Sequence, residues 1–154
     1  MEQQKQAIWD RRLFALANLV GDWSSDPNTK VGSVIVGPQN DIRAVGYNGL
    51  PRNIENDSVL FAAPLKYLWI EHAERNAIYS AARIGTPLPG CRMYVSWFPC
   101  ADCARAIVQV GLSELICVEP DWSHKTWSDQ FAQARRILEA GSVVVRFMEK
   151  SGSQ

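Results

Sequence analysis

The sequence has no excess of charge of either sign, because 16 lysines and arginines balance 16 aspartates and glutamates. A chain without net charge has no global electrostatic field that would gather nucleic acid or an anionic membrane surface. We therefore expect no nucleic-acid partner. A local basic pocket is still compatible with this balance.

Long apolar runs are also missing. No stretch approaches the ~18 consecutive apolar residues of a membrane-spanning helix, and residues 1–6 are polar with no apolar signal core behind them. We expect no membrane partner and a cytoplasmic location. Repeats and low-complexity segments are absent, and 154 residues suit one domain, which we place at residues 1–150 with a disordered tail at 151–154.

Histidine and cysteine are scarce, with two and four residues respectively. Four cysteines could form two disulfides, but Cys100 and Cys103 stand at the spacing of metal ligands and His72 lies upstream of them. We interpret Cys91 and Cys117 as reduced, buried strand residues.

One histidine and two cysteines can build a catalytic zinc site. His72, Cys100 and Cys103 would supply three ligands and leave the fourth tetrahedral position to water, which is the arrangement of catalytic rather than structural zinc. We expect one Zn²⁺ per chain, which would lower the pKa of its water from about 15.7 toward about 7. Glu74, two residues after His72, is the predicted catalytic group that would move protons without binding the metal.

Simpler interpretations of these residues exist. Taken alone, a Cys-x-x-Cys pair is more often a structural zinc half-site or a redox pair. A structural site needs a fourth donor, but Cys91 begins an apolar strand, and His124 in the tryptophan-rich segment 122–127 is more often a surface or capping residue. The proline before the cysteine pair and the upstream His-x-Glu favour the catalytic interpretation.

The order of elements predicts an α/β fold. A β-hairpin followed by alternating helices and strands indicates a mixed sheet covered by helices on both faces. Both metal-binding segments would begin helices, where the partial positive charge helps to keep thiolates deprotonated. The expected helices span 7–19, 71–83, 101–110 and 128–140, the expected strands 31–36, 42–47, 91–97, 115–118 and 143–147, and a long irregular loop runs from 48 to about 63.

The segments His72-Ala-Glu74 and Pro99-Cys-Ala-Asp-Cys103 carry the signature of zinc deaminases that act on cytosine or adenine. The chain resembles the cytidine/deoxycytidylate deaminase superfamily, and within it the deoxycytidylate (dCMP) deaminases, through segments 26–32, 46–52 and 72–78. The resemblance implies a three-layer α/β/α sandwich with a central mixed sheet of about five strands. It also implies a homo-oligomer that hydrolyses dCMP to dUMP and ammonia. Some members of the family are switched by deoxynucleoside triphosphates.

The resemblance also suggests contacts to the nucleoside part of the substrate. Asn48 would bond the 3′-hydroxyl of the sugar, and the segment Ser96, Trp97 and Phe98 would line the base pocket. Asn48 can alternatively be an ordinary turn residue.

Three further residues are candidates for phosphate contacts. Arg52 is our choice for the 5′-phosphate, since a guanidinium binds phosphate through paired hydrogen bonds, although a solvated loop arginine is an alternative. Asn28 and Lys30 are candidates for substrate or effector phosphates, and Asn28 can equally be a turn former.

The chain departs from the family pattern in two places. Segment 54–66 lacks the extra cysteine and histidine ligands that some members use for a second zinc, so we expect a single metal. Segment 121–127 is unusually rich in tryptophan and could reshape the specificity rim or an oligomer interface.

Other functions stay open on the sequence alone. A deaminase of a free nucleoside, of a free base or other amino-heterocycle, or of tRNA adenosine would use the same zinc chemistry. A zinc-stabilised interaction module without turnover is a further alternative, in which Glu74 would be only a helix-initiating acid.

Overall fold

The centre of the molecule is a five-stranded mixed sheet with strand order β2-β1-β3-β4-β5. β1 runs antiparallel to both of its neighbours, whereas β3, β4 and β5 are parallel. The computed structural model, which describes residues 1–149, has these strands at Gly32–Val36 (β1), Ile42–Tyr47 (β2), Arg92–Val95 (β3), Glu114–Val118 (β4) and Val144–Met148 (β5). The expected mixed sheet is confirmed.

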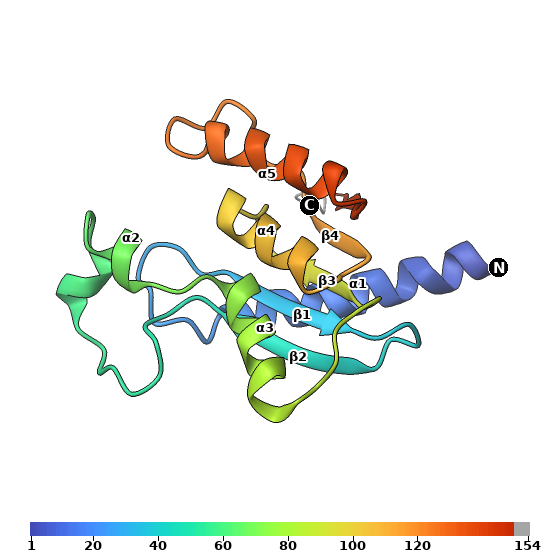
Figure 1. Ribbon diagram of the computed structural model, residues 1–154, viewed down its shortest axis with the longest axis horizontal. Coiled ribbons are helices and arrows are strands. Elements are labelled where there is room, and N and C mark those ends of the chain that lie inside the picture. The colour runs from blue at the N-terminus through green and yellow to red at the C-terminus, as the bar shows by residue number, and fades with distance from the viewer. Residues whose placement is uncertain (150–154) are drawn as a thin grey trace, which may run out of the picture.

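Helices cover both faces of this sheet (Figure 1). α1 (Glu2–Gly21) packs on one face, and α3 (Ala73–Ile84), α4 (Ala101–Gln109) and α5 (Ser128–Ala140) pack on the other. The alternation of strand side chains produces these two cores. Val34 and Ile116 face α1, while their neighbours Ile35 and Leu115 face the other three helices. The three-layer α/β/α arrangement is therefore confirmed.

The ends of several elements differ from the sequence expectation, and β3 spans only residues 92–95 rather than 91–97. Two further segments differ more. α1 begins five residues before residue 7, because the polar residues 2–6 are good helix formers even without an apolar face. The long loop contains a short 3₁₀-helix, η1 (Ser58–Phe61), and is followed by a one-turn helix, α2 (Lys66–Trp69). Phe61 is buried and anchors this segment. The tail expected at 151–154 lies outside the described residues.

Between residues 1 and 149, no helix combines the length and the apolar character needed to cross a bilayer.

Glycines let helices rest directly on the sheet backbone. A Cβ on Gly46 of β2 would lie 2.3 Å from the carbonyl oxygen of Ala73 and 2.3 Å from the backbone nitrogen of Ala77. α3 therefore touches β2 without any side chain between them. Gly32 of β1 plays the same part for α1, since its Cβ would lie 1.9 Å from the carbonyl oxygen of Ala17.

Gly46→Ala should destabilise the fold, because the added methyl group collides with the backbone of α3. We expect a loss of about 1–3 kcal/mol in the free energy of unfolding, measured by chemical denaturation. Gly49→Ala is the control, because a Cβ there meets no atom within 4 Å. Equal stability of the two variants would show that the close contact is not required.

Candidate metal centre

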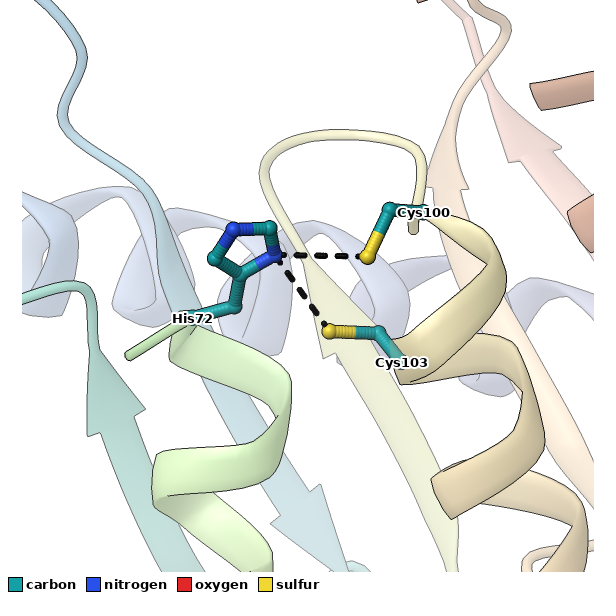
Figure 2. A group of neighbouring side chains, drawn as sticks. All are labelled: His72, Cys100 and Cys103. Carbon is teal, nitrogen blue, oxygen red and sulfur yellow. Dashed lines mark hydrogen bonds between the residues drawn. The ribbon is translucent and has the colours of Figure 1, made fainter. Parts of the chain in front are cut away.

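Three metal-binding side chains converge where α3 and α4 begin (Figure 2). His72 is the N-cap residue of α3, Cys100 is the N-cap residue of α4, and Cys103 lies in the first turn of α4. Nδ1 of His72 lies 3.4 Å from Sγ of Cys100 and 3.6 Å from Sγ of Cys103. Among the residues that the structure describes, this is the one group of His, Cys and acidic side chains whose ligand atoms lie close enough to hold an ion, all within 4.8 Å of one another.

These distances fit zinc. With Zn–N near 2.1 Å and Zn–S near 2.3 Å, tetrahedral geometry places a nitrogen and a sulfur ligand about 3.6 Å apart. The two observed nitrogen–sulfur distances fall at this value. The donor set of one imidazole and two thiols is also one that zinc prefers, and it leaves one tetrahedral corner open.

The electrostatics of the two thiols favour a bound cation. The hydrogen bond from Cys103 and the contact with His72 lower the pKa of Cys100 to about 4. The same hydrogen bond and burial raise the pKa of Cys103. Because a coordinating cation deprotonates thiols outright, a dication between these sulfurs would compensate the cost of two buried thiolates.

Glu74 is the acid nearest to this centre. Its side chain is only 3% exposed, and its Oε2 lies 3.6 Å from Sγ of Cys103. Burial raises the pKa of Glu74 above its ordinary value. A carboxyl group in this position can serve as a group that accepts and returns a proton.

The centre opens into a pocket of about 200 Å³. His72, Glu74 and Cys100 lie among its lining residues. The rest of the lining combines an aromatic wall with a few polar side chains, namely Trp97, Phe98, Trp127 and Phe131 for the wall and Asp26, Thr29, Asn48, Lys66 and His124 for the polar groups. A shape of this kind suits a flat aromatic ring with a polar substituent.

Asn48 lies in the pocket and is buried. Its Oδ1 accepts a hydrogen bond from the backbone N–H of Val31 at 2.8 Å, and its Nδ2 donates to the carbonyl of Thr29 at 2.8 Å. The amide is thereby fixed in orientation. Since an amide nitrogen has two hydrogens, Nδ2 keeps one for a ligand.

The three residues expected to line the base pocket have two different roles. Trp97 and Phe98 line the pocket, and Phe98 packs against Phe131 with ring centroids 5.7 Å apart. Ser96 is not among the lining residues. Its hydroxyl accepts a hydrogen bond from the backbone N–H of Gly32 at 3.0 Å, and so ties the end of β3 to β1.

The three residues expected to bind phosphate lie outside this pocket. Arg52 is exposed and lines a smaller pocket with Tyr47 and Asn76. Asn28 and Lys30 are exposed as well. The backbone N–H of Asn28 donates to Asp26, as in a turn, and the amine of Lys30 donates to a backbone carbonyl. The long loop carries Arg52 away from the metal centre, so a single chain does not bring it there.

A partly buried ion pair in the pocket was not predicted. Nζ of Lys66 lies 3.2 Å from Oδ2 of Asp26, whose side chain is 1% exposed. Burial opposes ionisation of Asp26, but hydrogen bonds from the backbone of Asn28 and Thr29 and from Lys66 lower its pKa. Lys66 begins the one-turn helix α2, which was not predicted from the sequence, so no spacing pattern identified it.

The tryptophan-rich segment forms part of the pocket. The ring of Trp127 lies 6.4 Å from the ring of His72 and 6.3 Å from that of Tyr67, both in edge-on contact. His124 caps its own loop, as the sequence suggested, but it also lines the pocket. Cys91 and Cys117 are free and buried, as expected, but only Cys117 lies in a strand, because β3 begins at Arg92.

Comparisons with known proteins relate this chain to deaminases. Residues 7–119 match the family model for the cytidine and deoxycytidylate deaminase zinc-binding region. An uncharacterized deaminase from the luxG 3′ region of Aliivibrio fischeri is 41% identical over 134 residues, covering 82% of this chain and 88% of that protein. The human deoxycytidylate deaminase is 35% identical over 144 residues, covering 90% of this chain and 78% of that protein.

A solved structure supports the same fold. The dCMP deaminase of cyanophage S-TIM5, crystallised in complex with dCMP and dUMP, superimposes with a TM-score of 0.73 at 23% identity. The match covers 96% of this chain and 98% of the phage protein.

Removing one sulfur ligand should remove the metal. We expect the purified protein to hold about one zinc per chain, and Cys103→Ala to hold almost none, because two remaining ligands bind zinc far more weakly. Cys117→Ala is the matched control, since it deletes an equally buried thiol from β4. Elemental analysis after dialysis measures both. Zinc retained by Cys103→Ala, or lost from Cys117→Ala, would contradict the assignment.

Proposed function

The chain belongs to the cytidine and deoxycytidylate deaminase family, and we propose that it catalyses the zinc-dependent hydrolysis of dCMP to dUMP and ammonia. The observation that carries this proposal is the convergence of His72, Cys100 and Cys103 beside the buried carboxyl group of Glu74 in one pocket. Relatives named deoxycytidylate deaminase, which match about nine tenths of the chain, support the choice of dCMP.

The metal and Glu74 would divide the chemistry. Zinc held by His72, Cys100 and Cys103 would supply a water made acidic enough to act as a nucleophile near neutral pH. Glu74 would take a proton from the attacking water and give it to the ring nitrogen N3 of cytosine. It would then transfer the second proton to the departing amine, which leaves as ammonia. The raised pKa of Glu74 suits a group that must both accept and donate.

The pocket walls would orient the base and sugar. The rings of Trp97 and Phe98 present apolar surface for the cytosine ring. The remaining N–H of Asn48 would donate to the sugar 3′-hydroxyl, because its other amide contacts hold it in place. The earlier choice of Arg52, Asn28 or Lys30 for phosphate gains no support from the position of these residues.

We also propose that a single domain at residues 1–150 acts as a homo-oligomer in the cytoplasm. Exposed apolar side chains on the segment around α2 favour self-association, with Leu68 82% and Val59 58% exposed. The free state of the four cysteines is consistent with a reducing compartment.

Glu74→Gln should leave zinc bound and remove turnover. The amide keeps the size of the side chain but cannot shuttle protons, so kcat should fall about 100- to 10,000-fold. Ammonia release and zinc content are measured on the same sample. Glu139→Gln, an exposed change on α5, serves as the control. Near-normal activity of Glu74→Gln would exclude the proposed mechanism.

A substrate panel tests the proposed substrate. We expect kcat/KM to be highest for dCMP among dCMP, CMP, deoxycytidine and cytosine, measured with and without dCTP and dTTP. The phosphate and the deoxyribose both add contacts that the smaller substrates lack. A preference for an unphosphorylated substrate would overturn the nucleotide assignment without affecting the zinc chemistry.

A further inference from the structure

The ring of His124 is held by its own loop in one orientation. Its Nδ1 accepts hydrogen bonds from the backbone N–H of Thr126 at 3.1 Å and of Trp127 at 3.2 Å. An atom that accepts from two N–H groups carries no proton, so the proton of the neutral imidazole must be on Nε2. The loop therefore selects the tautomer in which Nε2 is a hydrogen-bond donor.

These bonds also decide where that donor points. Nδ1 faces the chain at residues 126–127, and Nε2 lies on the far edge of the ring. His124 is half-buried and lines the pocket that contains the metal centre. Within residues 1–149, the hydrogen bonds of the ring are made through Nδ1. A directed N–H donor is thus left for a ligand in the pocket.

The position of His124 suits a contact with the end of the nucleotide that lies away from the reacting atoms. Trp127 contacts both histidines, since its ring lies against the ring of His72 and its backbone N–H donates to Nδ1 of His124. Trp127 also contacts Tyr67, the neighbour of Lys66, so the loop of His124 and α2 meet at this pocket. The amine of Lys66 is neutralised by Asp26, and this leaves the imidazole as a donor that is not already paired with an acid.

We propose that His124 is a specificity-determining residue whose Nε2–H donates to the 5′-phosphate of the substrate. This inference rests on the proposed deamination of dCMP. A phosphate offers only acceptor oxygens, and a hydrogen bond to a charged group is roughly twice as strong as a neutral one. The same contact is absent from a nucleoside, so His124 would discriminate dCMP from deoxycytidine.

Two substitutions separate this role from the capping role. In His124→Asn, Oδ1 can replace Nδ1 as the acceptor for the loop N–H groups, but the side chain is too short to replace Nε2. In His124→Gln, the longer side chain can carry an N–H to the place of Nε2, but it aligns poorly with the loop. His124→Asn therefore removes the donor to the ligand and keeps the hydrogen bonds within the loop, whereas His124→Gln does the reverse.

We expect His124→Asn to lose phosphate discrimination. The ratio of kcat/KM for dCMP to that for deoxycytidine should fall about 10- to 100-fold, mainly through a higher KM for dCMP. The ratio of Kd values for deoxyuridine and dUMP, measured by calorimetry, should fall by a similar factor without any need for turnover. The melting temperature should stay close to that of the wild type. In His124→Gln, both ratios should stay closer to the wild-type values than in His124→Asn, and the melting temperature should fall further.

Three outcomes would overturn the inference. If His124→Asn keeps both ratios, His124 does not contact phosphate. If its effect is equal for dCMP and deoxycytidine, the histidine binds the base or sugar or acts only through the fold. If the wild type itself binds dUMP no better than deoxyuridine and prefers deoxycytidine to dCMP, the proposed nucleotide substrate fails, and the inference fails with it.

Discussion

The contact between the first turn of α3 and the backbone of the sheet determines the geometry of the whole site. The hydroxyl of Ser33 donates to the carbonyl of Ala73 at 2.8 Å in a buried hydrogen bond, and Gly46 lets the same turn lie against β2. His72 and Glu74 flank Ala73 in sequence. The sheet therefore restrains the positions of His72 and Glu74, because the residue between them is held against its backbone.

The other half of the centre depends on a similar restraint. β3 is the central strand of the sheet, and its end is joined to β1 by two hydrogen bonds between Ser96 and Gly32. The chain then turns through Phe98, which is buried, into the N-terminus of α4. Both metal-binding segments thus begin helices next to β1 and β3, which are interior strands whose backbone is held on both sides.

The features that could be predicted from sequence are those with short-range spacing. The Cys-x-x-Cys pattern places its two thiols on one side of the first turn of a helix, and the His-x-Glu pattern stands at the start of another helix. Hydrophobic periodicity likewise identified the five strands and the four longer helices, with differences at the ends. α1 extended further, because polar helix formers at 2–6 leave no periodic signal.

The pocket wall could not be predicted in the same way, because it is built from contacts between distant segments. Lys66 meets Asp26 forty positions earlier, and Trp127 meets His72 across more than fifty. Arg52 shows the same difficulty. It was expected to face the metal centre, but it lines a second, smaller pocket. The path of a loop depends on which of its side chains are buried, as Phe61 is here, and no spacing pattern in the sequence identifies those side chains.

The separation between helix-borne ligands and loop-borne walls has a consequence for how such a protein can evolve. His72, Cys100, Cys103 and Glu74 belong to turns held against the sheet, whereas Lys66, His124 and Trp127 belong to two segments outside the sheet that meet at the pocket. Insertions or substitutions in those two segments can change which molecule is accepted while the reaction is preserved. Loops outside the sheet tolerate more variation than the elements they connect, so the pocket wall can vary while the residues at the starts of α3 and α4 stay in place.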